Sequence, residues 1–276
     1  MLGLGGCATA APPVAASLAR PPFRPVPPLA RINAKPERIF DITVCLRPFR
    51  AAGPRLDAET VGDKLVVHNY GHGGSGWSLS WGSAKVVVPK ALSTGQKDIA
   101  VIGCGALGLT AAITAQRAGA NVTIYAKDRM PEVRSARATG VWSPESRIST
   151  EAAAPAGFPV IWEQMARDSF RTFHHYLGLP GSPVEWIDRY VLFDAPPGRR
   201  ADPVGFAHYG SRIADLTPPT EALPGGAIRS RRRSPGAPRC RCSTSRSSAG
   251  CSPRNSCRPA AASRPWSSTR RPTSRS

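Results

Sequence analysis

The stretch from Asp98 to Tyr125 most constrains how this chain can fold. An apolar run, Asp98–Ile102, precedes a glycine turn, Gly103–Gly108, and a second apolar run, Asn121–Tyr125, follows a helix-forming segment that Gly119 terminates. Strand, G-x-G-x-x-G turn, helix and strand within about 30 residues are typical of a βαβ unit. Such a unit pairs its two strands in parallel, so the sequence predicts an α/β fold with a Rossmann-like sheet.

The glycine turn predicts a nucleotide site. Gly103 permits the tight turn, Gly105 lets the backbone approach a pyrophosphate, and Gly108 lets helix and strand pack closely. The helix N-terminus then presents free N–H groups to the phosphates. The candidate cofactor residues here are Gly103, Gly105, Ala106, Leu107 and Gly108. A glycine turn in an unrelated α/β protein is the alternative.

The end of the second strand departs from the usual nucleotide pattern. An acidic residue is expected there to bind the ribose hydroxyls, but Ala126-Lys127-Asp128 places the acid slightly late. Either Lys127 or Asp128 is expected near the adenosine.

A second glycine-rich segment, His68–Ala84, lies upstream of the turn. It holds five glycines between Gly71 and Gly82. Glycine at this density indicates positive φ angles or close approach of the backbone to a ligand. His68 and His72 fit either buried structural imidazoles or catalysis, and the structural interpretation is favoured.

These segments together resemble the D-amino-acid oxidase family. The match comprises His68–Ala84 with Leu46-Arg47-Pro48-Phe49-Arg50 upstream, the Gly103–Gly108 turn, and Ala138–Pro144. It covers roughly residues 36–225. In that family the glycine turn opens the chain and the HNYGHGG segment ends it, so the order here is reversed, as in a circular permutation.

The resemblance implies FAD as the cofactor and assigns residues to it. Ser135 matches a hydroxyl position near the pyrophosphate, and the Gly140-Val141-Trp142 turn would lie along the flavin ring. The loop that would pass the flavin and the substrate comprises Gly73, Gly74, Ser75, Gly76, Trp77 and Ser78.

The resemblance also implies two substrate contacts. The carbonyl of Gly74 would accept the substrate amine, and Arg47 would bind the substrate carboxylate. A planar guanidinium gives the two parallel charge-assisted bonds that lysine cannot reproduce. No side chain is expected to be catalytic, because the flavin performs the chemistry. Tyr190 and Tyr209 stay unassigned as substrate-covering tyrosines.

The implied function is oxidation of D-amino acids to imino acids, which hydrolyse to α-keto acids and ammonia, with hydrogen peroxide as the second product. The implied partners are a D-amino acid and molecular oxygen, with a homodimer as an open option. A related glycine or amine oxidase, an inactive truncated oxidase fragment and an Arg-rich nucleic-acid-binding protein are the alternatives. Nucleic-acid binding is not expected, because the basic tail holds one aromatic residue, Trp266. No metal site is expected.

The chain divides into four predicted regions. Residues 1–36 form a disordered leader, 37–150 an FAD-binding domain, 151–226 a partial antiparallel α+β substrate domain, and 227–276 a disordered tail. The FAD-binding domain combines the permuted motif at 39–92 with the βαβ unit at 98–150. Further strands are expected at 39–46 and 64–67, helices at 77–92 and 158–177, and a hairpin at 184–187 and 190–193.

The tail explains the net charge of +19. Thirteen arginines lie from Arg229 onward, and no acidic residue follows Glu221. We interpret the tail as out of frame or truncated, because a shifted reading of Arg254–Ala261 permits a helix end with a glycine stop.

The beginning of the chain leaves localisation open. Leu4-Gly5-Gly6-Cys7 resembles a lipobox without its basic and apolar context. A cytoplasmic protein and an exported, lipid-anchored periplasmic protein are both kept as hypotheses. No run of about 20 apolar residues predicts a membrane span.

Overall fold

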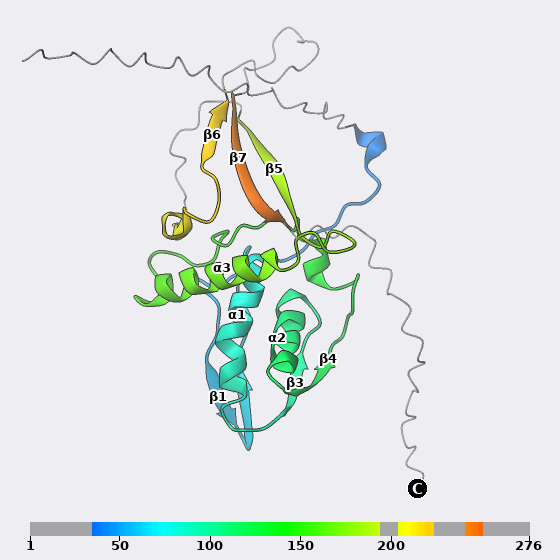
Figure 1. Cartoon of the computed structure of the whole chain (residues 1–276), viewed down its shortest axis with the longest axis vertical. Coiled ribbons are helices and arrows are strands. Elements are labelled where there is room, and N and C mark those ends of the chain that lie inside the picture. The colour runs from blue at the N-terminus through cyan, green and yellow to red at the C-terminus, as the bar shows by residue number, and fades with distance from the viewer. Residues whose placement is uncertain (1–34, 194–203, 224–240, 251–276) are drawn as a thin grey trace, which may run out of the picture.

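The computed structural model describes residues 35–193, 204–223 and 241–250, with the backbone alone for 190–193, 221–223 and 241–250. The predicted α/β class is confirmed, because a parallel pair of strands and a separate antiparallel sheet are both present (Figure 1). The elements are η1 Pro36–Arg38, β1 Ala58–Val61, β2 Lys64–Val67, α1 Gly76–Ala91, β3 Asp98–Ile102, α2 Ala106–Arg117, β4 Asn121–Tyr125, η2 Arg134–Arg137, α3 Phe158–His174, β5 Glu185–Phe193, η3 Gly210–Ile213, β6 Thr220–Leu223 and β7 Arg241–Gly250.

The βαβ unit forms as the sequence predicts. β3 and β4 pair in parallel, with Asp98 opposite Asn121 and Ile102 opposite Tyr125. Gly119 ends α2 with a φ of +89°, a conformation that costs glycine little. The N–H of Ala120 donates to the carbonyl of Ala115 at 3.0 Å and closes the last turn.

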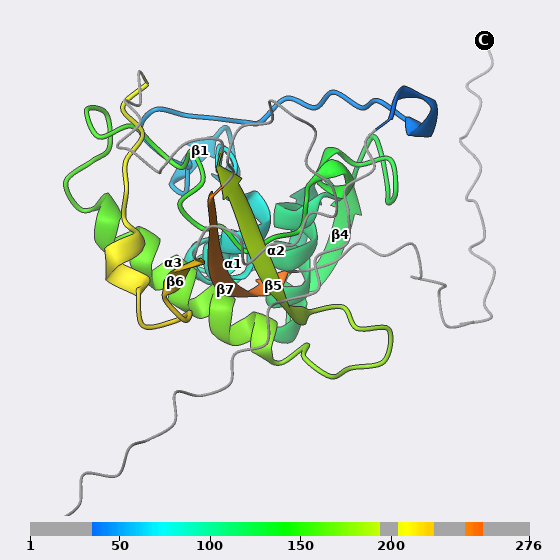
Figure 2. The ribbon, with the colours of Figure 1, turned by 90° about the horizontal axis from the view of Figure 1, so that it is seen from above.

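Helix α1 packs against both other helices. It lies beside α2, and its N-terminal half crosses α3, as Figure 1 and the view from above in Figure 2 both show. The helices approach closely at Gly82, where a Cβ atom would collide with the backbone of Met165. The N–H of Gly82 also donates to Ser169 Oγ at 2.8 Å. A glycine in the middle of α1 therefore sets the distance between α1 and α3.

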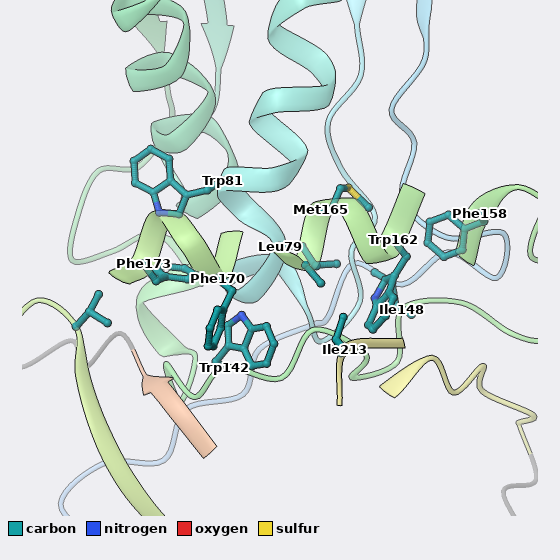
Figure 3. Close-up of a cluster of buried hydrophobic side chains, with 12 residues drawn as sticks. Leu79, Trp81, Trp142, Ile148, Phe158, Trp162, Met165, Phe170, Phe173 and Ile213 are labelled. Atoms are coloured by element: carbon teal, nitrogen blue, oxygen red, sulfur yellow. The ribbon is translucent and has the colours of Figure 1, made fainter. Parts of the chain in front are cut away.

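The main hydrophobic core lies at this crossing (Figure 3). It combines α1, the loop after η2, α3 and η3, so side chains from both predicted regions, 37–150 and 151–226, share one core. Trp142 packs against Phe170 with ring centroids 5.1 Å apart. The labelled members are Leu79, Trp81, Trp142, Ile148, Phe158, Trp162, Met165, Phe170, Phe173 and Ile213.

The strand prediction for residues 39–46 is wrong. The segment runs without regular secondary structure, because it pairs with no other strand among the described residues. Its apolar side chains are exposed, from 59% at Ile39 to 100% at Phe40. The segment thus has the alternation of apolar and polar residues that is typical of a strand, but within the described part of the chain it lacks a neighbouring strand to share backbone hydrogen bonds.

The predicted hairpin at 184–193 is also wrong. β5 is one continuous strand that pairs antiparallel with β7, and β7 pairs with β6 on its other side. Asp188 and Arg189, at the expected turn, are not residues that favour a two-residue hairpin loop, so the chain continues straight. The tail is expected to be disordered, but its residues 241–250 form strand β7. The structure does not describe the rest of the predicted tail, 227–240 and 251–276. It also does not describe residues 1–34, which include the Leu4–Cys7 motif.

Smaller differences concern helix ends and one unpredicted strand. α3 ends at His174 rather than at 177, and β1 pairs antiparallel with the predicted strand β2. Within the described ranges, no helix is long and apolar enough to cross a membrane.

Replacing Gly82 with alanine should separate α1 from α3. Although alanine favours a helix over glycine by about 1 kcal/mol, the new Cβ meets backbone that cannot rotate away. We expect a net loss of about 1–3 kcal/mol in the free energy of unfolding, measured by urea denaturation. Gly157→Ala is the matched control, because nothing lies within 4 Å of the added Cβ. Equal stability of the two variants would contradict the close crossing.

Candidate functional site

The glycine turn has the backbone geometry that its sequence predicts. Gly103 has a φ of +107°, and its N–H donates to the carbonyl of Tyr125 at 2.8 Å, which fixes the turn to the end of β4. A Cβ atom on Gly108 would collide with the carbonyl of Gly103. The third glycine therefore allows α2 to start directly against the turn.

Ser135 lies beside this turn. Its hydroxyl oxygen accepts a hydrogen bond from the N–H of Ala106 at 3.0 Å. A Cβ atom on Gly105 would lie 3.2 Å from the same oxygen. The carbonyl of Ser135 accepts a bond from Trp77 Nε1 at 2.7 Å. Three predicted cofactor segments, around residues 77, 106 and 135, thus meet at one place.

The loop Gly73–Ser78, called the glycine loop below, lies along the segment that follows Trp142. The N–H of Gly74 donates to the carbonyl of Ser146 at 2.9 Å. The buried Ser75 hydroxyl lies 3.2 Å from the carbonyl of Ser143 and 3.1 Å from that of Ser146. Ser78 Oγ accepts the N–H of Ser143 at 2.7 Å. The loop and the Gly140–Trp142 turn are therefore brought together.

Arg47 is held next to Gly74. The N–H of Gly73 donates to the carbonyl of Pro48 at 2.9 Å, which attaches the Arg47 segment to the glycine loop. A Cβ atom on Gly74 would lie 2.9 Å from Arg47 Nη1, so the absent side chain leaves room for the guanidinium. The structure therefore places the predicted carboxylate-binding and amine-binding groups side by side.

A cavity of about 290 Å³ lies between residues 43–46 and η2. Its lining includes Arg134 and Arg137, which flank Ser135. Sequence reasoning singled out Ser135 and overlooked both arginines, although two basic residues within two positions of a phosphate-side hydroxyl are a readable signal. Together with Glu132, which lines the same cavity, they give its lining a net positive charge.

Other candidates stand apart from this place. Lys127 and Asp128 are exposed beyond β4. His68 Nε2 lies 2.8 Å from Glu59 Oε1 on the β1–β2 hairpin. Tyr209 packs against Trp162 in the core, with ring centroids 5.3 Å apart. A core position for Tyr209 argues against a role in covering a substrate, and the side chain of Tyr190 lies outside the described part.

His72 is a buried structural imidazole at the base of the glycine loop. Its Nε2 lies 2.6 Å from Ser83 Oγ on α1, and the Ser83 hydroxyl donates to Met165 Sδ at 3.3 Å. Burial lowers the pKa of His72 from 6.5 to about 3. The neutral side chain thus connects the loop to the α1–α3 crossing through a side-chain hydroxyl rather than the backbone, and its Nδ1 is buried without a partner among the described residues.

This pKa makes stability depend on pH. The unfolded chain binds a proton at His72 at higher pH than the folded chain does, so the free energy of unfolding falls as pH drops from 6.5 toward 3. The slope from one such group is at most about 1.4 kcal/mol per pH unit. Compared with His72→Gln, the wild type should lose its stability advantage as urea denaturation moves from pH 7 to pH 5. The exposed His175→Gln variant is the control, and a constant wild-type advantage would contradict the prediction.

The residues present fit an FAD cofactor. Within the described part of the chain, the space at Gly105 is bordered only by Ser135, and the glycine loop leads from Ser135, through Trp77, to Arg47 beside Gly74. Trp142 Nε1 is buried without a hydrogen-bond partner among the described residues. His72 Nδ1, Glu145 Oε2 and both side-chain amide atoms of Asn69 are likewise buried without a partner there.

Comparisons with known proteins identify the family to which this chain belongs. A family model described as FAD dependent oxidoreductase matches residues 98–259, which include part of the segment interpreted as out of frame. A D-aspartate oxidase of Talaromyces thermophilus is 44% identical over 72 residues, covering 23% of this chain and 20% of the relative. A D-amino-acid oxidase of Dictyostelium discoideum is 58% identical over 48 residues, covering 17% of this chain and 14% of the relative.

A D-amino acid oxidase of Dugesia ryukyuensis is 49% identical over 55 residues, covering 18% of this chain and 16% of the relative. The chain thus spans at most one fifth of the length of these curated relatives. No solved structure matches. The family model covers more than half of the chain, and the chain therefore belongs to the family of FAD-dependent oxidoreductases, with FAD as its cofactor.

Proposed function

We propose that this chain serves the FAD-dependent oxidation of D-amino acids to imino acids, which hydrolyse to α-keto acids and ammonia while oxygen is reduced to hydrogen peroxide. The observation that carries the proposal is the position of Arg47 beside Gly74 on a loop bonded to residues 143–146. A cationic fork and a backbone carbonyl at adjacent positions suit the carboxylate and the amine of an α-amino acid. The names of the relatives support D-amino acids as the substrate class.

Binding is the contribution that the chain's own residues make. Gly103, Gly105, Ala106, Leu107 and Gly108, with Ser135, would hold the pyrophosphate through backbone N–H groups and one hydroxyl. Lys127 or Asp128 would lie near the adenosine. Gly140–Trp142 and the glycine loop would line the flavin ring. Bound FAD supplies the acceptor for the hydride that leaves the substrate Cα.

The same residues would raise the rate of oxidation by holding the substrate in a fixed orientation. Two parallel hydrogen bonds from Arg47 fix the plane of the substrate carboxylate, and a bond from the amine to the Gly74 carbonyl fixes a third point. Three fixed points define which face of the Cα atom is presented and so distinguish one enantiomer from the other. A related glycine or amine oxidase would use the same carboxylate and amine contacts and would differ in the side-chain pocket.

Two alanine substitutions separate folding of the glycine turn from cofactor binding. Gly108→Ala should lose both thermal stability and FAD uptake, because its Cβ collides with the Gly103 carbonyl. Gly105→Ala should keep its melting temperature and weaken FAD binding, because its Cβ meets only Ser135 Oγ at 3.2 Å and occupies the space proposed for phosphate. Quenching of flavin fluorescence measures uptake. Wild-type FAD affinity in Gly105→Ala would remove Gly105 from the pyrophosphate site.

Replacing Arg47 with alanine should leave FAD uptake unchanged and weaken carboxylate binding. Loss of a charge-assisted pair of hydrogen bonds corresponds to a fall of about 10- to 100-fold in benzoate affinity. Benzoate is titrated into the FAD-loaded full chain while the flavin absorbance is recorded. Arg47→Lys should recover part of the affinity, and Arg38→Ala on the distant η1 is the charge control. Unchanged benzoate affinity in Arg47→Ala would exclude the proposed contact.

A further inference from the structure

Arg147 has an unusual backbone conformation at the edge of the glycine loop. Its φ is +52°, in the left-handed region that non-glycine residues enter only at a cost. The residues after it, Ile148 and Ser149, are fully buried, so the turn is fixed from inside. Strain at a residue with a long charged side chain, where glycine or asparagine would fit better, points to a use for that side chain.

The backbone of Arg147 is part of the proposed substrate site. A Cβ atom on Gly73 would collide with the Arg147 carbonyl, and the preceding carbonyl, of Ser146, accepts the N–H of Gly74. Arg47 reaches the same pair of glycines, because its Nη1 lies 2.9 Å from the space that a Gly74 Cβ would fill. Arg47 and Arg147 therefore flank two consecutive glycines.

An aromatic pair supports the Arg147 side chain. Its Cζ atom lies 6.0 Å from the ring centroid of Phe206, within the range of a cation–π contact. Phe206 in turn packs edge-on against Phe49, with centroids 5.4 Å apart. Phe49 lies 3.4 Å from the space that a Gly73 Cβ would fill. The Arg147 guanidinium thus lies on Phe206, which packs on Phe49, the ring that borders Gly73.

Both arginines lack a counter-charge. Over residues 35–193 and 204–223, Arg55 and Arg167 form ion pairs with carboxylates at 2.7–3.0 Å, but neither Arg47 nor Arg147 forms one. The Arg47 guanidinium at Gly74, and an unpaired guanidinium on Arg147, whose backbone borders Gly73, together favour a ligand with two anionic groups. If Arg47 binds one carboxylate of such a ligand, the Arg147 guanidinium is free to bind the second.

We propose that Arg147 is a specificity-determining residue that binds the side-chain carboxylate of a dicarboxylic D-amino acid, while Arg47 binds the α-carboxylate. The inference rests on the proposed function, because Arg47 and the Gly74 carbonyl orient the substrate in both. The proposed function leaves the substrate side chain open. Here Arg147, which lies outside the glycine loop and the Arg47 segment, makes the site prefer acidic over neutral substrates.

Succinate and butyrate test this preference, because they share a four-carbon chain and differ by one carboxylate. Each is titrated into the FAD-loaded full chain at fixed ionic strength while the flavin absorbance is recorded. The wild type should bind succinate about tenfold more tightly than butyrate. Arg147→Met should remove that ratio and leave butyrate affinity within twofold. Arg147→Lys should retain part of the ratio.

Two further variants separate charge from fold. Arg147→Gly removes the guanidinium and relieves the positive φ, so it should raise the melting temperature while it abolishes the preference for succinate. A merely structural arginine would not give these two opposite changes. Arg38→Met removes one positive charge from exposed η1 and should leave the succinate-to-butyrate ratio unchanged, which excludes a general effect of net charge.

The outcomes distinguish this inference from the proposed function. An unchanged ratio in Arg147→Met, or equal losses of succinate and butyrate, overturns the role of Arg147 and leaves the role of Arg47 intact. Failure of the FAD-loaded wild type to bind either acid overturns both. A ratio that disappears in Arg147→Met and Arg147→Gly but persists in Arg38→Met supports the second carboxylate site.

Discussion

The site depends on the buried hydroxyl of Ser75. This group lies within hydrogen-bond distance of two carbonyls, those of Ser143 and Ser146, and so holds two segments about 70 positions apart in the chain. The Ser143 carbonyl also accepts the N–H of Ser146, and the Ser146 carbonyl accepts the N–H of Gly74, so Ser75 reinforces a turn whose carbonyls already have backbone partners. The Ser75 hydroxyl, the N–H of Gly74 and Ser78 Oγ together fix the path of the glycine loop along residues 143–146.

Helix α1 connects the glycine loop to α2 and α3. The loop continues into α1 without interruption, and the small residues of α1 allow close contact with α2 and α3. Thr110 on α2 donates to the carbonyl of Ser80 at 3.1 Å, while Gly82 contacts α3. The position of the glycine turn at the start of α2 is therefore tied to the position of the glycine loop through one helix.

Sequence patterns predicted the parts of the structure that local chemistry determines. β3, β4 and the start of α2 lie where the apolar runs and glycines place them, because a glycine turn and a glycine stop act on their immediate neighbours. The strand expected at 39–46 failed for the opposite reason, since strand pairing requires a distant partner that no local pattern reveals. The hairpin expected at 184–193 failed for the same reason, because β5 pairs along its length with the distant strand β7.

The candidate site shows the same division. The glycine turn, Ser135, the glycine loop and Arg47 were readable as motifs, and the structure brings them together. Their contacts were not readable, because the bonds from Ser75 and Ser78 to Ser143 and Ser146 join segments that share no pattern. Arg147 escaped notice because a left-handed arginine looks like any arginine in a sequence, and only its φ angle distinguishes it.

The reversed order of the two glycine segments has a consequence for folding kinetics. Leu92–Lys97 joins α1 to β3 directly, with Gly95 at a φ of +78°, so most of the proposed cofactor contacts lie in the continuous stretch 73–142. An arrangement with these segments at opposite ends of a chain must close a loop of nearly its whole length before they meet, and that closure entropy grows with length. Here α1, β3, α2 and β4 follow one another, and neighbours in sequence are neighbours in space. The contacts among these four elements therefore close short loops, whereas the bonds from Ser75 to Ser143 and Ser146 span 68 and 71 positions and carry a larger closure entropy.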